Sequence, residues 1–192
     1  ERLSDLRKEF DFTLIGGWAI YLYTGLHKSR DIDILVSIET LSELKEKKQL
    51  VKNDRLKKYE IHDDGFDIDI YVPYYSRLAV PVEEILEGHT LKIQGINTVE
   101  PEILAMLKQA ALRDRKESAK GTKDAIDIIT LVKNSGFDAE KYKKLLKKYG
   151  HEEYLQELKS AVKGFGHSEY LGMDFVEYKK WKKDFLETFI KA

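Results

Sequence analysis

A glycine pair followed by two closely spaced aspartates constrains the fold of this chain more than any other feature. A short apolar run, Phe12 to Ile15, leads into Gly16-Gly17 and then into a helix-like segment that ends at Gly25. The next apolar run opens with Asp31-Ile32-Asp33. Backbone N–H groups at a glycine turn that begins a helix can cradle an anion. The order of strand, glycine turn, helix and strand therefore predicts an anion site close to two carboxylates.

The two aspartates predict a metal site. Side chains alternate between the faces of a strand, so Asp31 and Asp33 point to one side and Ile32 and Ile34 to the other. Carboxylates held this close repel each other unless a cation or a proton lies between them. Mg²⁺ binds a few carboxylates together with the phosphates of a substrate. We therefore expect Mg²⁺ here, with Mn²⁺ as an alternative; an exposed edge strand is the competing interpretation.

A third carboxylate is expected from a later strand. Residues 66–72 place apolar side chains on one face and Asp67, Asp69 and Tyr71 on the other, after a hairpin turn at Asp63-Asp64-Gly65. In two-metal sites a further carboxylate completes the cage or takes the proton of the attacking hydroxyl. We prefer Asp69, which lies deeper between apolar neighbours, to Asp67, which is nearer to the turn. The sequence leaves that choice open.

The overall composition excludes several classes of protein. Lys plus Arg number 33 against 34 for Asp plus Glu, so the whole chain has no general attraction to nucleic acid or anionic lipid. The lysine-rich segments 45–58 and 141–148 form either a local basic face or an ordinary solvated surface. No apolar run is long enough to span a membrane. The absence of cysteine excludes disulfides and fits a protein of the cytoplasm.

Helices dominate the second half of the chain. In the first half, Thr40 and Glu43 predict a capped helix through about residue 48, and Gln94-Gly95 predicts a small hairpin. From Pro101 onward, the periodicity predicts helices at about 101–119, 123–134, 138–149, 151–163 and 174–190. We therefore expect an α/β domain over residues 1–99 and a helical domain over residues 100–192.

The order of these motifs resembles the nucleotidyltransferase superfamily, which includes DNA polymerase beta and the minimal nucleotidyltransferases. The closer resemblance is to its AbiEii-type branch, whose members include toxins of toxin–antitoxin pairs. The motifs of that branch match Gly16-Gly17, then the block Ser29-Arg30-Asp31-Ile32-Asp33, then Lys108 with Arg113, and finally Lys123-Asp124 followed by Asp127. The resemblance covers residues 12–131. It implies an α+β fold with a nucleotidyltransferase-like mixed sheet flanked by helices, followed by a C-terminal helical bundle.

The resemblance also implies roles for individual residues. Asp31 and Asp33 would hold Mg²⁺ ions that bridge the phosphates of a nucleoside triphosphate such as ATP, and Asp69 would complete the site and help to deprotonate the acceptor. Nucleotide binding would fall to Gly16, Gly17, Ser29, Arg30 and Lys108, in which the glycines let the backbone approach the phosphates. Where many relatives have Ser, this chain has Gly17. Bulky Trp18 follows and either packs in the core or borders the nucleotide.

These roles imply a metal-dependent enzyme that transfers NMP from a nucleoside triphosphate to a hydroxyl group. Acceptors consistent with the family are RNA such as tRNA, a protein or a small molecule. An antitoxin protein would be a further partner if the enzyme is a toxin. A metal-dependent phosphodiesterase that uses the same carboxylates is a third possibility, which the glycine turn disfavours. The main alternative is a catalytically silent module of the same fold that binds a protein or RNA. The Asp31, Asp33 and Asp69 carboxylates disfavour it, because a silent module has no physical reason to keep groups that repel each other.

Overall fold

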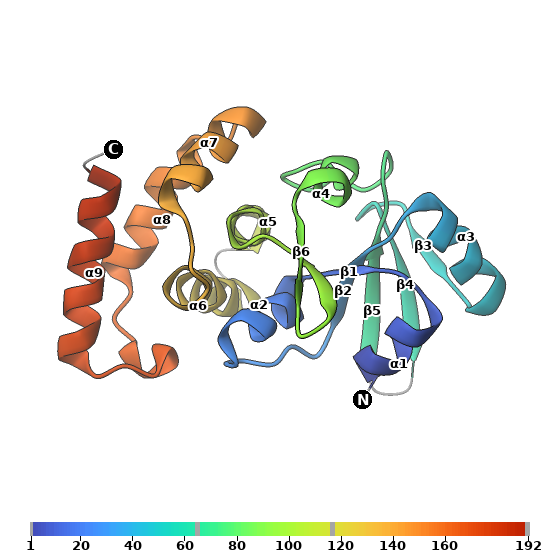
Figure 1. Ribbon diagram of the computed structural model, residues 1–192, viewed down its shortest axis with the longest axis horizontal. Coiled ribbons are helices and arrows are strands. Elements are labelled where there is room, and N and C mark those ends of the chain that lie inside the picture. Colours follow the sequence, from blue (N-terminus) through green and yellow to red (C-terminus); the bar gives the residue numbers. More distant parts are fainter. Residues whose placement is uncertain (1, 64–65, 116–117, 191–192) are drawn as a thin grey trace. The chain divides into compact units, whose positions relative to one another are not determined.

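The computed structural model of the protein describes residues 2–63, 66–115 and 118–190 (Figure 1). The chain divides into two compact units, Glu1–Glu100 and Pro101–Ala192. The boundary expected from the sequence lies one residue earlier. Across the described ranges, no helix combines the length and the apolar character that crossing a membrane requires.

Within residues 2–63 and 66–100, a seven-stranded mixed sheet forms the centre of the N-terminal unit (Figure 1). Its strands lie in the order β3-β4-β5-β2-β1-β7-β6. Two neighbouring pairs are parallel, β2 with β5 and β1 with β7, and the other neighbours are antiparallel. The strands are β1 (Thr13–Ile15), β2 (Ile32–Leu35), β3 (Val51–Asn53), β4 (Lys58–Asp63), β5 (Phe66–Tyr71), β6 (Thr90–Ile93) and β7 (Ile96–Val99).

One face of the central strands is apolar and lies beneath a helix. In register, Ile34 of β2 pairs with Ile70 of β5, which pairs in turn with Tyr59 of β4. Lys45 of α3 (Ile38–Lys47) lies 5.0 Å from the centre of the Tyr59 ring, so this helix covers that face near β4. The other helices of the unit are α1 (Arg2–Glu9), α2 (Gly16–Thr24) and α4 (Val82–Gly88). Because side chains alternate along strands, the aspartates of β2 and β5 lie on the opposite face.

The hairpin and the helices expected in the first half are present, with local corrections. The expected capping box at Thr40 is wrong, because α3 begins earlier and Ser37 is its N-cap: the Ser37 hydroxyl accepts a hydrogen bond from the Thr40 amide at 3.1 Å. The sequence did not predict β3, which is short and largely exposed. Of the expected turn at 63–65, residues 64 and 65 lie outside the described residues; β4 and β5 pair up to Asp63 and Phe66.

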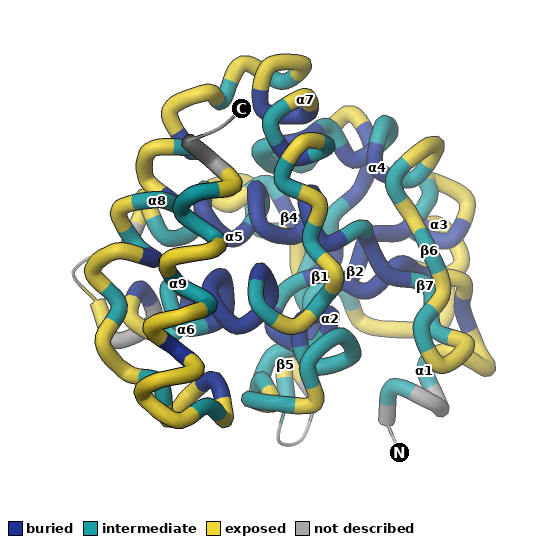
Figure 2. Tube along the Cα trace, turned by 60° about the vertical axis from the view of Figure 1, so that its left-hand side comes forward, coloured by how far each residue is buried: buried dark blue, intermediate teal, exposed yellow. Residues whose placement is uncertain are grey.

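The C-terminal unit is helical, as expected, and α5 and α6 carry most of its buried positions (Figure 2). Its elements are α5 (Pro101–Arg115), α6 (Ala119–Asn134), α7 (Ala139–Tyr149), α8 (Glu153–Gly164), the short 3₁₀ helix η1 (Ser168–Leu171) and α9 (Phe175–Ile190). α5 ends at Arg115, before the expected end at about residue 119, and α6 begins at Ala119, before the expected start at about residue 123. Ser118 caps α6 by accepting a hydrogen bond from the Gly121 amide, and residues 116 and 117 lie outside the described part.

Candidate active site

Parallel pairing of β2 with β5 places Asp33 beside Asp69. The two residues are register partners, as are Ile32 with Ile68 and Ile34 with Ile70 on the opposite face. Neighbouring strands lie about 4.8 Å apart, and register partners point to the same face. The two carboxylates are therefore adjacent although 36 positions separate them in the chain. Asp69, which the sequence favours as the third carboxylate, thus lies next to Asp33.

The glycine turn lies directly against the Asp33 carboxylate. Gly16 follows β1 and begins α2 with a φ of +65°, in the left-handed region. A side-chain Cβ at this position would lie 2.1 Å from Oδ2 of Asp33. Only glycine fits both the backbone angle and the space, so the carboxylate and the first turn of α2 are in direct contact. The start of α2 and the Asp33 side chain therefore lie side by side.

Asp69 differs from Asp67 in burial and in partners. The side chain of Asp69 is 19% exposed, whereas that of Asp67 is 54% exposed and pairs with Nδ1 of His62 at 2.8 Å. Burial raises the pKa of the Asp69 carboxyl, against the effect of a nearby lysine, and the charges of Glu60 and Asp31 raise it further. Asp31, immediately before β2, is thus close enough for its charge to act on Asp69. The more enclosed, electrostatically coupled carboxylate is Asp69.

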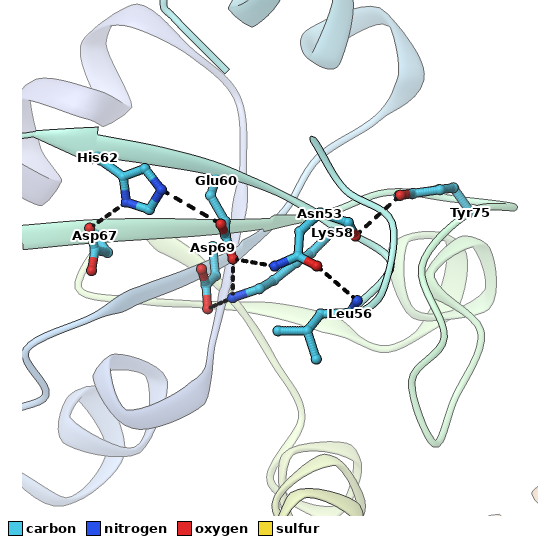
Figure 3. A network of polar contacts seen from close by, with 8 residues as sticks. All are labelled: Asn53, Leu56, Lys58, Glu60, His62, Asp67, Asp69 and Tyr75. Carbon is cyan, nitrogen blue, oxygen red and sulfur yellow. Dashed lines mark hydrogen bonds and ion pairs between the residues drawn. The ribbon is translucent and has the colours of Figure 1, made fainter. Parts of the chain in front are cut away.

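Two residues of β4, Lys58 and Glu60, lie beside Asp69 (Figure 3). Glu60 is the register partner of Asp69 on the side away from Asp33. Lys58 Nζ lies 2.6 Å from Oδ2 of Asp69 and 2.9 Å from Oε1 of Glu60. Although burial lowers the pKa of the Lys58 ammonium, these two carboxylates raise it above its ordinary value. The ammonium group therefore stays charged.

Sequence reasoning missed Lys58 and Glu60, and the pattern of β4 contains the signal that identifies them. Residues 58, 60 and 62 are polar and alternate with Tyr59 and Ile61, which belong to the apolar face. Once β4 is paired with β5, this alternation places Lys58 and Glu60 on the face of Asp69. The sequence alone did not specify the register in which β4 pairs with β5.

The donor set suits a hard divalent cation, but the groups are not already arranged around one. Asp31, Asp33, Asp69 and Glu60 with Lys58 carry a net charge of −3 when all are ionised, and all four acids offer oxygen ligands. Within the described ranges, no three acidic or histidine side chains are close enough as they stand to hold a metal ion. Lys58 occupies one oxygen of Asp69. The chemistry of the residues fits Mg²⁺, provided that these side chains rearrange.

The remaining candidates of the first unit lie in or after the glycine turn. Gly17 is buried in the first turn of α2, and Ser29 and Arg30 lie in the loop that leads into β2, with Arg30 exposed. Trp18 is half-buried and contacts the Tyr21 ring edge-on at 5.6 Å. Its indole N–H is buried and has no hydrogen-bond acceptor among the described residues. Both interpretations of Trp18, core packing and nucleotide contact, stay open.

Lys108 belongs to the C-terminal unit, where it holds α5 to α6. Its Nζ lies 2.9 Å from Oδ2 of Asp127 and 3.1 Å from Oδ1 of Asp124, and its side chain is only 10% exposed. Although burial lowers the pKa of Lys108, the two aspartates raise it above its ordinary value. Lys108 donates a hydrogen bond to each of the two aspartates, and Arg113 pairs with Glu153 on α8.

Comparison with known proteins identifies the class of fold. The chain has the nucleotidyltransferase fold. In this chain the glycine turn after β1 lies against Asp33 of the mixed sheet. No protein-family model and no curated protein matches this sequence.

The similar solved structures include two of ANT(2″)-Ia, an antibiotic-resistance factor. The crystal structure, in complex with adenylyl-2″-tobramycin, is 18% identical and covers 77% of this chain and 90% of its own, with a TM-score of 0.50. The solution structure is 17% identical and covers 80% of this chain and 89% of its own, with a TM-score of 0.53. An antigenic nucleotidyltransferase-like protein from Paracoccidioides brasiliensis, 17% identical, covers 90% of this chain and 92% of its own, with a TM-score of 0.42.

Proposed function

We propose that the protein is a metal-dependent nucleotidyltransferase. The observation that supports this most directly is the contact of Gly16 with Asp33, whose register partner on β5 is Asp69. A helix start that can seat phosphates thus adjoins carboxylates that can hold the accompanying cations. The fold, which is shared with ANT(2″)-Ia, agrees with this reading.

In the proposed reaction, a hydroxyl oxygen of the acceptor attacks the α-phosphorus of a nucleoside triphosphate such as ATP. The bond to the β-phosphate oxygen breaks, so NMP is transferred and pyrophosphate leaves. Bound Mg²⁺ would neutralise the phosphate charges and polarise the α-phosphate. Asp31, Asp33 and Asp69 would hold it, and the first turn of α2 at Gly16 and Gly17 would orient the phosphates.

Asp69 is our candidate for the proton acceptor. Burial raises the pKa of its carboxyl, which makes the carboxylate a stronger base than an exposed aspartate. Ser29 and Arg30 would contribute a hydroxyl and a positive charge beside the triphosphate. Lys108 would bring its positive charge to the triphosphate only if its ammonium left Asp124 and Asp127 or contacted the phosphates in addition to them.

The acceptor we favour is RNA, because the N-terminal unit carries a local basic surface. Segment 45–58 contains seven basic and two acidic residues in a chain whose net charge is −1. Lysines attract phosphates, so this segment can bind the backbone of an RNA acceptor. A small molecule is the alternative, since ANT(2″)-Ia was solved with adenylyl-2″-tobramycin.

We infer the setting of the reaction from the sequence pattern. A cytoplasmic enzyme has access to nucleoside triphosphates and RNA, and the chain has no cysteine that would call for an oxidising compartment. The likeness of Gly16-Gly17 and of the block 29–33 to the AbiEii-type branch suggests the toxin of a toxin–antitoxin pair. Arrest of growth on expression, relieved by a protein encoded beside it, would test this role.

Transfer of label from nucleoside triphosphates to RNA, with and without Mg²⁺, tests the proposed activity. We expect Asp33→Ala to reduce transfer at least roughly a hundredfold, because it removes both a ligand and the group that contacts the glycine turn. The fold should persist, since the substitution relieves repulsion. Undiminished transfer by a folded Asp33→Ala protein would exclude this site.

The same assay decides between the two candidates on β5. Asp69→Asn should lose transfer, whereas Asp67→Asn should keep most of it, because Asp67 is half-exposed and pairs with His62. The opposite order would make Asp67 the third carboxylate.

A further inference from the structure

Three acidic side chains stand side by side across β2, β5 and β4. Asp33 is the register partner of Asp69, and Asp69 is the register partner of Glu60. Like charges directly opposite each other on neighbouring strands destabilise a sheet. This carboxylate row (Asp33, Asp69 and Glu60) therefore needs positive charge nearby whenever the protein has no metal ion bound.

Lys58 supplies positive charge at the row (Figure 3). It lies two residues before Glu60 on the same face of β4, and its side chain is only 11% exposed. Its ammonium contacts Asp69 at 2.6 Å and Glu60 at 2.9 Å. A lysine ammonium is a compact charge on a flexible stem, so it can leave one carboxylate while keeping another.

The contact with Asp69 conflicts with the proposed function, on which this inference rests. The Lys58 ammonium lies 2.6 Å from Oδ2 of Asp69, and a divalent cation bound to the same carboxylate would repel it across a few ångströms. A divalent cation also makes the ammonium redundant, since it brings more charge to the same carboxylate. The two cations therefore compete for Asp69.

Glu60 provides a second position for the displaced ammonium. Its carboxylate already accepts a hydrogen bond from the Asn53 side chain of β3 at 3.0 Å, which fixes it on the side of the row away from Asp33. Lys58 Nζ already lies 2.9 Å from Oε1 of Glu60, so this acid is in position to hold the lysine by itself. When a divalent cation binds Asp69, Lys58 therefore has only to leave that carboxylate and keep its contact with Glu60.

We propose that Lys58 is a built-in counter-cation that holds Asp69 in the metal-free protein, is displaced from it by the divalent ion, and then remains on Glu60. Lys58 is thus a positioning residue that competes with the metal.

Binding of Mn²⁺ alone to the full chain, measured by the electron paramagnetic resonance of free Mn²⁺, tests the proposal without any transfer reaction. Lys58→Met should bind Mn²⁺ about tenfold more tightly than the natural protein, because the competing ammonium is gone. Lys58→Arg should bind it more weakly, since a guanidinium grips two carboxylates by a fork of hydrogen bonds.

The Lys58→Arg variant distinguishes an effect of the hydrogen-bonded contact with the carboxylates from an effect of positive charge alone. If Lys58 acted only through its charge, Lys58→Arg would match the natural protein, and that result would overturn the proposal. It also keeps the test decisive should Lys58→Met fail to fold. The matched control is Lys52→Met, which removes an exposed lysine paired with Asp54 from the same strand hairpin and should leave Mn²⁺ affinity unchanged.

The outcomes distinguish this inference from the proposed function. Mn²⁺ binding that depends on Asp33 but is the same in both Lys58 variants would overturn the counter-cation role and leave the transferase proposal standing. Absence of Mn²⁺ binding to both the natural protein and Asp33→Ala would overturn both. The affinity order Met, Lys, Arg at position 58, with Lys52→Met unchanged, would support the role.

Discussion

Gly16 shows how one residue combines a backbone requirement with a contact in the site. Its φ of +65° and the 2.1 Å that would separate a Cβ from Asp33 each exclude other residues. Gly25, at the end of the same helix, has a similar φ of +68° but nothing within 4 Å of its Cβ position. The two glycines therefore allow the two effects to be measured separately.

We predict that Gly16→Ala loses more than Gly25→Ala in both stability and transfer. Left-handed strain costs about 1–2 kcal/mol in either case. Only at Gly16 must the Asp33 carboxylate also move, which disrupts the site. Urea unfolding and the transfer assay measure the two effects. Equal losses in the two variants would mean that the contact with Asp33 has no consequence.

The pair of His62 and Asp67 predicts a pH dependence at the rim of the site. The Asp67 carboxylate raises the pKa of His62 above its ordinary 6.5. The pair therefore stabilises the fold fully below about pH 6.5, and this contribution is lost as the pH rises through the raised pKa. We predict that Asp67→Asn lowers the pKa of His62 in an NMR titration. An unchanged titration curve would show that the pair does not persist in solution.

At the scale of elements, Lys108 makes α5 and α6 depend on each other. Two aspartates of α6 share its ammonium, and Oδ1 of Asp127 is buried without a hydrogen-bond partner among the described residues. Removing the lysine would leave two buried carboxylates without their positive partner.

We predict that Lys108→Met destabilises the protein by about 3–5 kcal/mol, because a buried pair has lost one partner. Chemical denaturation measures this, and Lys183→Met, at an exposed pair with Glu187, should have no measurable effect. If Lys108→Met instead unfolds at the same denaturant concentration as the natural protein but has a higher KM for the nucleotide, the lysine binds the triphosphate rather than joining the two helices.

At the scale of the whole molecule, a ligand that binds only the folded protein must raise its stability. At a hundred times the dissociation constant, the gain is about 2.7 kcal/mol. We predict that ATP with Mn²⁺ raises the Tm of the full chain and that Asp33→Ala abolishes the shift. Differential scanning calorimetry measures both. A Tm shift that survives in Asp33→Ala would place nucleotide binding elsewhere in the protein.

Local patterns in the sequence were sufficient for most of the helices and strands and for the candidate pair Asp31 and Asp33. The strand, glycine turn and helix of residues 12–25, the alternation of β5 and the helical second half depend on side-chain periodicity and on glycine, which act over a few neighbouring residues. For the same reason Asp31 and Asp33 were identifiable as a pair. The errors in this part, Ser37 in place of Thr40 as the cap of α3 and the earlier end of α5 and start of α6, are shifts of a few positions.

Pairing between distant segments established the rest. The adjacency of Asp33 and Asp69 follows from the parallel register of β2 and β5, and the roles of Lys58 and Glu60 follow from the register of β4. Lys108 likewise found its partners on another helix. On the strands, a one-residue slip of register would turn Asp33, Asp69 or Glu60 to the other face of the sheet. Such registers depend on the packing of the apolar face as a whole, and no short stretch of sequence specifies them.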